Sequence, residues 1–335
     1  MRSIKSFEKL NRIAEGSYGI VYRAKDLDSG EIVAIKKLKL EREREGFPVT
    51  SLREINSLMT LKHPHVVNLR EMVVGEDLEG VFMVMDYGEH DLKTLLENLN
   101  EPLSLSEVKT ILRQILEGVA FMHEHWTLHR DLKTSNLLFT NGGQVKIADF
   151  GLSRKYDSTC ASDNSLTPVV VTLWYRAPEL LLGQSDYSEA VDMWSVGCIF
   201  GELLLGQPLF PGQGEIDQLD KISRVLGAFS ATKHPHLSKL PHFAKLRRQT
   251  YPDRLDTMFK MLPPTGLKLL KGLLAVEPQN RTSAKAALED EFFGEEPLPK
   301  DPRVFPTWPS MNEREPRRRD GNNTPVAPQR PQLQD

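Results

Sequence analysis

Two short polar segments in the middle of the chain constrain its architecture more than any other feature. The first, residues 129–136, contains Asp131 and Asn136, and the second is Asp149-Phe150-Gly151. Asn136 follows Asp131 by five residues and Asp149 follows it by eighteen, and the apolar run 145–147 predicts a strand that ends just before Asp149. Carboxylate and amide oxygens suit Mg²⁺, and a carboxylate also accepts protons. The simpler interpretation is a solvated polar loop followed by a glycine turn.

Size and composition narrow the class of protein. A chain of 335 residues exceeds what one hydrophobic core usually supports, so two lobes are expected. The net charge of −3 gives no electrostatic case for binding nucleic acid or a membrane surface. Cys160 and Cys198 are too few for a disulfide framework or a zinc pattern, which predicts a reducing compartment. The chain has no apolar run near the roughly 20 residues of a membrane span, and residues 1–5 lack the apolar stretch of a secretory signal.

The periodicity changes along the chain and predicts two unlike halves. Strands are predicted at 20–24, 31–35 and 81–85, where short apolar runs alternate with turns. After a switch at 86–90, apolar spacings of three and four predict helices, at about 91–98, 106–125, 189–205, 215–226 and 264–275. From about residue 296 the chain is Pro-rich and polar, which predicts little fixed structure. The fold class is therefore α+β.

One helix is predicted inside the strand-rich half, beginning near Thr50-Ser51. Ser51 and Glu54 fit a capping box, in which a hydroxyl and a carboxylate satisfy backbone amides reciprocally. An apolar stripe follows at spacings of three and four, made of Leu52, Ile55, Leu58 and Met59. The stripe fits a packing helix and a partner-binding helix equally well.

The segment 13–21 carries two glycines, Gly16 and Gly19, between predicted strands. Glycine lets backbone amides approach phosphate oxygens closely, although a plain hairpin has the same pattern. What favours a phosphate loop is Lys36, which ends the next apolar strand, together with Glu54 eighteen residues later.

Taken together, these segments resemble the eukaryotic protein kinase family. One segment resembles the PSTAIRE-type helix of cyclin-dependent kinases, namely Pro48-Val49-Thr50-Ser51-Leu52-Arg53-Glu54. Its amino-acid sequence is most similar to that of the PITSLRE-type branch. Segments 45–48, 167–171, 192–197 and 305–309 fit that branch as well, and the resemblance covers about residues 3–310.

The resemblance implies a two-lobed kinase fold, with a small antiparallel-sheet lobe that holds one helix and a larger, mainly helical lobe. The implied boundaries are an N-terminal extension at 1–6, a kinase domain at 7–293 and a largely disordered tail at 294–335. Within the domain, the small lobe would cover 7–86 and the large lobe 87–293.

The resemblance also assigns the catalytic and metal-binding residues. Asp131 would accept the proton of the substrate hydroxyl or orient it, and Lys133 would neutralise charge on the transferring phosphoryl group. Asn136 and Asp149 would hold Mg²⁺. Lys36, paired with Glu54, would reach the α- and β-phosphates of ATP.

The implied nucleotide site comprises Ile13, Ala14, Glu15, Gly16, Ser17, Tyr18, Gly19, Val21, Ala34, Lys36, Asp86, Gly88, Asp91, Leu138 and Asp149. Ile13, Val21, Ala34 and Leu138 would enclose the adenine, the hinge 86–88 would read its edge, and Asp91 would meet the ribose. Ala14 stands where the family usually has glycine, and a methyl group there tightens the loop.

Regulatory and substrate-binding residues follow from the same resemblance. Thr167 stands at the activating phosphorylation position, with Arg53, Arg130 and Arg154 as the matching arginines, and Ser17 and Tyr18 match inhibitory sites. Val170, Val171 and Arg176 would shape a pocket that prefers proline after the target residue, because proline has no N–H to leave unpaired. Thr172 would hydrogen-bond near Asp131. Glu179 would form a structural ion pair with Arg281.

The expected function is that of a cyclin-dependent Ser/Thr kinase that uses ATP and Mg²⁺ and acts on proteins at Ser/Thr-Pro sites. The branch implies an L-type cyclin, a role in transcription, pre-mRNA splicing or the cell cycle, and a location in the nucleus with the cytoplasm as a second compartment. No nucleic acid or membrane partner is expected. Two alternatives remain open, namely a cyclin-bound pseudokinase scaffold and a neighbouring cyclin-dependent branch with a different cyclin.

Overall fold

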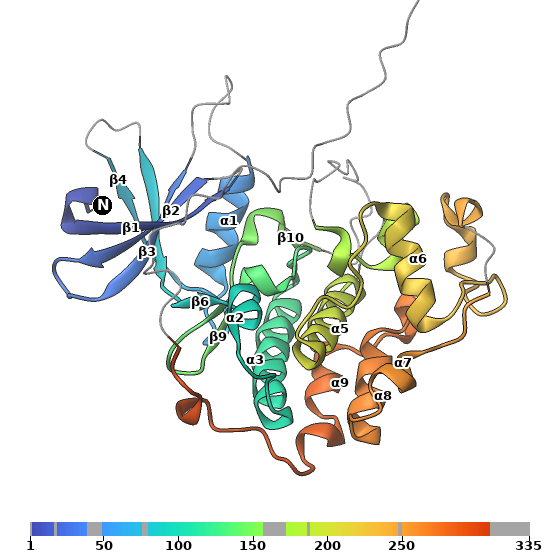
Figure 1. The fold of residues 1–335 in the computed structure, drawn as a ribbon. Coiled ribbons are helices and arrows are strands. Elements are labelled where there is room, and N and C mark those ends of the chain that lie inside the picture. Colours follow the sequence, from blue (N-terminus) through green and yellow to red (C-terminus); the bar gives the residue numbers. More distant parts are fainter. Residues whose placement is uncertain are drawn as a thin grey trace, which may run out of the picture.

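The structure is a computed structural model that describes residues 2–16, 19–38, 49–75, 80–156, 172–185, 188–246 and 250–308. The predicted two-lobed architecture is confirmed. Figure 1 shows a sheet with a single helix beside it, followed along the chain by a larger body of helices.

The small lobe is built on one five-stranded antiparallel sheet with the order β1-β2-β3-β5-β4. Its strands are β1 (Phe7–Gly16), β2 (Gly19–Asp26), β3 (Ile32–Leu38), β4 (Leu69–Val74) and β5 (Val81–Asp86). Alternate side chains of a strand point to opposite faces of the sheet. Accordingly, Val33 and Ile35 join one small apolar cluster with Phe7, whereas Leu38 and Met83 join the main core. Both faces of the sheet therefore carry buried apolar side chains.

Helix α1 (Val49–Thr60) packs within the small lobe. The predicted capping box is wrong, because Ser51 lies inside the helix and is buried, and Glu54 binds a lysine instead of the helix start. The apolar stripe divides into two groups. Leu58 is fully buried in the core, whereas Leu52 and Met59 are 50% and 63% exposed.

The large lobe is mainly helical, as predicted. Its helices are α2 (Leu92–Asn98), α3 (Leu105–Glu124), α4 (Pro178–Leu181), α5 (Ala190–Leu205), α6 (Glu215–Leu226), α7 (Leu255–Met258), α8 (Pro264–Leu273) and α9 (Ala284–Leu288). A capping box on Ser104 and Glu107 begins α3. Almost every residue of α5 is buried, so this helix is the centre of the lobe. Among the described helices, none combines the length and apolar character needed to cross a lipid bilayer.

Short strands line the junction between the lobes. They are β6 (His90–Asp91), β7 (Thr127–Leu128), β8 (Leu137–Phe139), β9 (Val145–Ile147) and β10 (Arg154–Lys155). Strands β6, β8 and β9 form one antiparallel sheet, and β10 pairs with β7. The predicted strand before Asp149 is thus present as β9.

Residue Arg2 near the start of the chain and residues 294–308 near the end of the described part lie against the body of the protein. Arg2 forms ion pairs with Asp26, Asp28 and Glu71 at 2.7–2.8 Å. Residues 294–308, which composition assigns to the tail, contact α3, and Phe305 is buried.

A buried ion pair joins two segments of the large lobe that are distant in the sequence. Arg281 contacts both carboxylate oxygens of Glu179 at 2.8 and 3.0 Å, and the two side chains are 0% and 1% exposed. The predicted Glu179–Arg281 pair is confirmed. The guanidinium also donates to the backbone oxygens of Ala275 and Ala190, so its N–H groups are well satisfied.

We predict that Arg281→Ala lowers the free energy of unfolding by about 3–5 kcal/mol, because it leaves the Glu179 carboxylate buried and unpaired. Urea denaturation followed by circular dichroism measures the change. Arg113→Ala is the matched control, since Arg113 forms an exposed helical pair with Glu117 and its loss should change the free energy by less than about 1 kcal/mol. Equal effects of the two substitutions would contradict the prediction.

Candidate active site

A lysine and a glutamate from the small lobe form a buried ion pair. The Lys36 amine on β3 lies 2.7 Å from both carboxylate oxygens of Glu54 on α1, and both residues are buried. Burial raises the pKa of Glu54 even though the charge and hydrogen bonds of Lys36 oppose the shift. The nearby carboxylate of Asp149 raises this pKa further, so the lysine of the small lobe and Asp149 of the large lobe face the same region.

Helix α1 is also tied to the segment that follows Asp149. The Ser57 hydroxyl on α1 and the Ser153 hydroxyl lie 2.9 Å apart, and both residues are buried. Ser153 comes directly after the short 3₁₀ turn η3 (Phe150–Leu152). The position of α1 that forms the Lys36–Glu54 pair is therefore the one that also forms this second bond.

The predicted catalytic residues of the large lobe form one hydrogen-bond network. Lys133 donates to Asp131 Oδ2 at 2.7 Å. The side-chain amide of Asn136 donates to the backbone oxygen of Asp131 at 2.8 Å and to its Oδ2 at 3.1 Å. Because both donors use Oδ2, the network fixes the carboxylate while Oδ1 stays available to a substrate hydroxyl. Fixing the amide nitrogen of Asn136 also turns its oxygen away from Asp131.

The network is joined to Asp149 through the backbone and through His129. The amide of Ala148 donates to the Asn136 backbone oxygen at 2.9 Å. His129 accepts the amide of Asp131 at Nδ1, so its Nε2 carries the proton that it donates to the Ala148 oxygen at 3.0 Å. His129 thus connects the two polar segments, residues 129–136 and 149–151, which are thirteen residues apart in the sequence.

Asp149 has a strained backbone and an unpaired carboxylate. Its φ of 66° lies in the left-handed region, which a residue other than glycine rarely adopts. In the described part of the chain, no hydrogen bond or ion pair reaches its side chain, which is half-buried. A carboxylate that has no partner among the described residues is a ligand that suits a hard divalent cation.

The described residues do not gather three or more His, Cys, Asp or Glu side chains that could enclose a metal ion by themselves. Asn136 and Asp149 are the residues that would hold the ion.

A buried carboxylate that sequence reasoning missed holds the catalytic segment in place. Asp192 on α5 is fully buried and accepts hydrogen bonds from the amides of His129 and Arg130 at 2.9 and 2.8 Å and from His123 Nε2 at 3.0 Å. Burial alone would raise the pKa of Asp192, but His123 and the Arg130 amide hold it below its ordinary value. The available signal was a carboxylate inside a largely apolar helix.

A second set of buried hydrogen bonds connects Thr134, just after Asp131, to α5 and to the 3₁₀ turn η4 (Leu173–Tyr175). Thr134 Oγ1 lies 3.0 Å from Glu202 Oε1 and 3.0 Å from the Tyr175 hydroxyl, which donates to Glu202 at 2.6 Å. Burial and the carboxylate of Glu202 raise the pKa of Tyr175, so its proton stays on the hydroxyl. Sequence reasoning missed these residues too, since an isolated Thr or Tyr carries no pattern.

The predicted adenine-binding residues line the inner side of the sheet and the strand β8. Ala34 is buried opposite Met85, and Val21 pairs with Lys36 across β2 and β3. Leu138 on β8 is half-buried, and a Cβ on Gly88 would lie 2.8 Å from the Leu138 Cβ. The hinge backbone therefore rests directly on Leu138.

The polar hinge residues have structural partners of their own. The Asp86 carboxylate binds Arg70 and Lys146 at 3.0 Å. Asp91 caps α2, accepting the Thr94 amide at 2.8 Å and its hydroxyl at 2.6 Å. A carboxylate has about four lone-pair positions, so Asp91 can still accept a ribose hydroxyl.

The glycine-rich turn joins β1 and β2, with Gly16 opposite Gly19 and Ala14 opposite Val21. A Cβ on Gly19 would lie 2.4 Å from the Lys37 backbone oxygen, so this glycine is also required for β2 to approach β3. Ile13 is half-buried on β1, and Ala14 is exposed. The predicted sites Ser17 and Tyr18 lie outside the described residues, as does the side chain of Glu15.

The structure places only part of the predicted regulatory and substrate sites. Thr167, Val170 and Val171 lie outside the described residues. Arg130 follows β7 and Arg154 lies on β10, which pairs with β7, so these two arginines come from neighbouring segments. Arg53 is exposed on α1.

A hydrogen bond of Thr172 near Asp131 is predicted from the sequence, and within the described part of the chain no such bond is present. Thr172 is exposed at the start of η4, and among the described residues the partners of the Asp131 carboxylate are Lys133 and Asn136. Arg176, the other described member of the predicted pocket, lies 3.6 Å from Glu215 at the start of α6.

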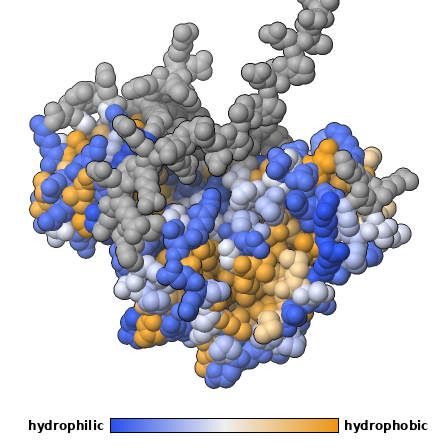
Figure 2. Space-filling model, in the orientation of Figure 1, coloured by the Kyte–Doolittle hydropathy of each residue, from blue (hydrophilic) through white to orange (hydrophobic). Residues whose placement is uncertain are grey.

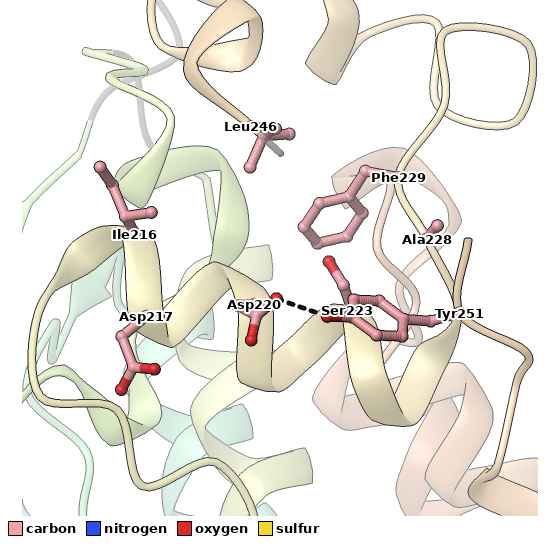
Figure 3. A pocket seen from close by; sticks show the side chains of 8 residues that line it. All are labelled: Ile216, Asp217, Asp220, Ser223, Ala228, Phe229, Leu246 and Tyr251. Atoms are coloured by element: carbon pink, nitrogen blue, oxygen red, sulfur yellow. Dashed lines mark hydrogen bonds between the residues drawn. The ribbon is translucent and has the colours of Figure 1, made fainter. Parts of the chain in front are cut away.

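A separate hollow of about 370 Å³ lies against α6. Figure 3 shows its lining side chains, with the Tyr251 hydroxyl donating to Asp220 at 2.9 Å. Apolar residues such as Ile216 and Phe229 make up much of the remainder. None of the predicted site residues lines it.

Comparison with protein families matches residues 7–293 to the protein kinase domain. The chain is 52% identical over 316 residues to human cyclin-dependent kinase 11B, with 94% of this chain and 39% of that protein covered. It is 53% identical to cyclin-dependent kinase G-2 of Oryza sativa subsp. indica, with 93% of this chain and 45% of that protein covered. It is 51% identical to the serine/threonine-protein kinase PITSLRE of Drosophila melanogaster, with 93% and 34% covered. The chain thus spans less than half the length of these relatives.

A solved structure gives an independent match to the fold. The crystal structure of the yeast RNA Pol II CTD kinase CTDK-1 complex contains a chain that superposes with a TM-score of 0.82 at 37% sequence identity. The match covers 91% of this chain and 98% of that one.

We predict that Asp192→Asn lowers the free energy of unfolding by about 1–3 kcal/mol at pH 6, because an amide cannot accept all three hydrogen bonds. Since the folded pKa of Asp192 lies below its ordinary value of 3.8, its stabilising effect is present above that pH and is lost as the pH falls through the lowered pKa.

Urea denaturation of both proteins between pH 6 and pH 3 checks this prediction. The gap between their free energies of unfolding should shrink toward pH 3, and a gap that stays constant would contradict the prediction. Asp256→Asn, which alters an exposed partner of Lys271, is the control and should show a small gap throughout.

Proposed function

Because this chain belongs to the protein kinase family, we propose that it is a cyclin-dependent protein Ser/Thr kinase. It would transfer the γ-phosphate of ATP to Ser or Thr hydroxyls of protein substrates, with a preference for a following proline. The observation that carries the proposal is the buried Lys36–Glu54 pair near Asp149, together with the hydrogen bonds between Asn136 and Asp131. A backbone bond from Ala148 to Asn136 joins these hydrogen bonds to the segment of Asp149. Phosphoryl transfer needs these parts from both lobes.

ATP and Mg²⁺ are the cofactors of this proposal. Lys36 would bind the α- and β-phosphates, held in place by Glu54. Asn136 and Asp149 would hold the metal, which when bound neutralises charge on the phosphates. The unpaired Asp149 carboxylate supports this assignment, since a buried or half-buried carboxylate without a partner is unfavourable unless a cation is bound.

The hydroxyl of the substrate would meet Asp131. Its carboxylate is fixed by Lys133 and Asn136 through Oδ2, so Oδ1 can accept the hydroxyl hydrogen bond and orient the attacking oxygen. Lys133 lies close enough to the same point to stabilise negative charge that develops on the phosphoryl group.

A cyclin is the proposed partner, and α1 offers the surface for it. Leu52, Ile55 and Met59 are spaced by three and four residues, so they share one face of the helix. Leu52 and Met59 are exposed, whereas Leu58 points into the core. Figure 2 shows hydrophobic and hydrophilic residues mixed over the exposed part of the small lobe. The resemblance of 48–54 to the PITSLRE-type helix favours an L-type cyclin.

The remaining parts of the proposal rest on resemblance. Arg176 would contribute to a pocket for the proline of the substrate, and phosphorylation of Thr167 would engage Arg53, Arg130 and Arg154. A nuclear location, with the cytoplasm as a second compartment, and a role in transcription, pre-mRNA splicing or the cell cycle complete the proposal. The pseudokinase alternative is disfavoured by the full set of catalytic side chains and their hydrogen bonds.

We predict that the purified chain with a cyclin transfers labelled phosphate from ATP to a Ser-Pro peptide, and does so faster than to the matching Ser-Ala peptide. Asp131→Asn should lower kcat by about 10²- to 10⁴-fold while nucleotide affinity changes little, because the hydroxyl loses its acceptor. Asp256→Asn, on the surface of the large lobe, is the control and should keep full activity. Full activity of Asp131→Asn would overturn the catalytic assignment, and inactivity of the unaltered complex would favour the pseudokinase alternative.

We predict that Met59→Glu weakens cyclin binding by at least about tenfold, because a charge is placed in an apolar contact. Pull-down with candidate cyclins, followed by titration of kinase activity with the cyclin that binds, measures the effect. Met261→Glu changes an 88% exposed methionine of the large lobe and is the matched control. Equal cyclin binding by both variants would exclude this face of α1 as the contact.

A further inference from the structure

The segment after the last helices forms a strap across the back of the large lobe. We define the strap as residues 295–308, which include the short 3₁₀ turn η9 (Pro302–Val304). Figure 1 shows it running from the region of α9 past the lower end of α3 and up toward β9, beside the junction of the lobes. The proposed function gives this segment no task.

Several specific hydrogen bonds hold the strap to α3. The Ser106 and Thr110 hydroxyls donate to the backbone oxygens of Leu298 and Lys300 at 2.5 and 2.7 Å, and the Lys300 amide donates to the Ser106 oxygen at 3.2 Å. Lys300 also forms an ion pair of 2.9 Å with Glu107 in the capping box of α3. Paired backbone groups over several residues indicate a seated segment, in contrast to a chain that lies loosely on the surface.

The strap then crosses the turn between β8 and β9 at very close range. A Cβ on Gly143, whose φ is 73°, would lie 2.0 Å from the Pro302 backbone oxygen. The same turn is fixed from below by the buried Gln114, which donates to the Gly143 oxygen at 3.0 Å and accepts the Val145 amide at 2.9 Å. Only glycine fits between the turn and the strap, so the two backbones are in direct contact.

Two aromatic residues end the strap against the sheet of β6, β8 and β9. The Phe305 ring is buried and lies 5.6 Å from the Phe139 ring, and Trp308 lies 5.8 Å from Phe139 and 6.5 Å from His90 in edge-to-face arrangements. His90 is 1% exposed, and within the described residues neither of its ring nitrogens has a hydrogen-bond partner. Its ring therefore acts as an aromatic packing surface.

These aromatic partners are the immediate neighbours of the predicted nucleotide-binding residues. His90 pairs with Phe139 across β6 and β8, and the next pair is Asp91 with Leu138. Alternation along a strand turns Leu138 to the face opposite Phe139. The strap thus packs on one face of the β6–β8 pair. The opposite face of that pair carries Leu138, the residue expected to contact adenine.

We propose that Phe305 and Trp308 are positioning residues for the nucleotide. By packing on Phe139 and His90, they fix the distance between Leu138 and the hinge backbone at Gly88. They also fix the orientation of the Asp91 side chain. The close approach of Gly88 to Leu138 makes the hinge sensitive to any displacement of β8, because the gap leaves no room for a side chain. This role rests on the proposed function, since Leu138 and Asp91 belong to its nucleotide site.

The test is direct binding of Mg²⁺-ADP and Mg²⁺-ATP to the full chain, measured by calorimetry without any phosphoryl transfer. Phe305→Ala and Trp308→Ala should each raise Kd by about tenfold, since a shift of ~1.4 kcal/mol corresponds to that factor. In the kinase assay, KM for ATP should rise in parallel, while KM for the peptide and kcat at saturating ATP stay within about twofold. Phe305→Leu, which keeps an apolar side chain, should restore most of the affinity.

Arg303→Ala is the matched control on the same strap, because its side chain is 87% exposed and pairs with Asp301. It should leave Kd unchanged. Should Phe305→Ala fail to fold, Trp308→Ala carries the test, since Trp308 is only half-buried.

Unchanged Kd in the aromatic variants would overturn the positioning role. The positioning role would also be overturned if kcat of the aromatic variants fell by the same factor by which KM for ATP rises, at temperatures far below unfolding. That pattern indicates a general loss of structure. Absence of nucleotide binding by the unaltered chain would overturn the proposed function instead, so the two failures are distinguishable.

Discussion

The arrangement of the candidate active site depends on one buried carboxylate, that of Asp192 at the centre of the large lobe. It receives the amides of His129 and Arg130 and so fixes the backbone immediately before Asp131. His129 passes this constraint to the Ala148 oxygen, next to Asp149. A single anion inside an apolar helix therefore sets the relative position of groups that lie far apart in sequence, and burial makes its hydrogen bonds strong because water cannot compete.

The same region stores backbone strain. Arg130 and Asp149 have φ values of 68° and 66°, which cost on the order of 1–3 kcal/mol each for residues other than glycine. Such conformations persist only where the surroundings determine them, and here the two amides bound by Asp192 and the Ala148–Asn136 bond do so. The strain places a carboxylate where a regular strand or turn would not.

Much of the fold could be predicted from sequence because its signals are local. Periodicity located α3, α5 and α6 within one or two residues. The ion pair of Lys36 and Glu54 was anticipated by the resemblance to the kinase family. The errors arose where a local signal competed with a distant partner. Ser51 and Glu54 have the spacing of a capping box, yet the buried lysine outcompetes the helix start for the carboxylate. Asp192 and the strap contacts were missed because their partners are backbone groups, which no sequence pattern identifies.

The bond between Ser57 and Ser153 gives α1 a second connection, to the chain that follows Asp149. A displacement of α1 breaks this bond together with the Lys36–Glu54 pair, so both contacts form or separate in concert. Thermodynamic linkage makes the effect reciprocal. A molecule that binds the outer face of the helix and favours this position of α1 would change the affinity for a nucleotide by the same factor by which the nucleotide changes the affinity for that molecule.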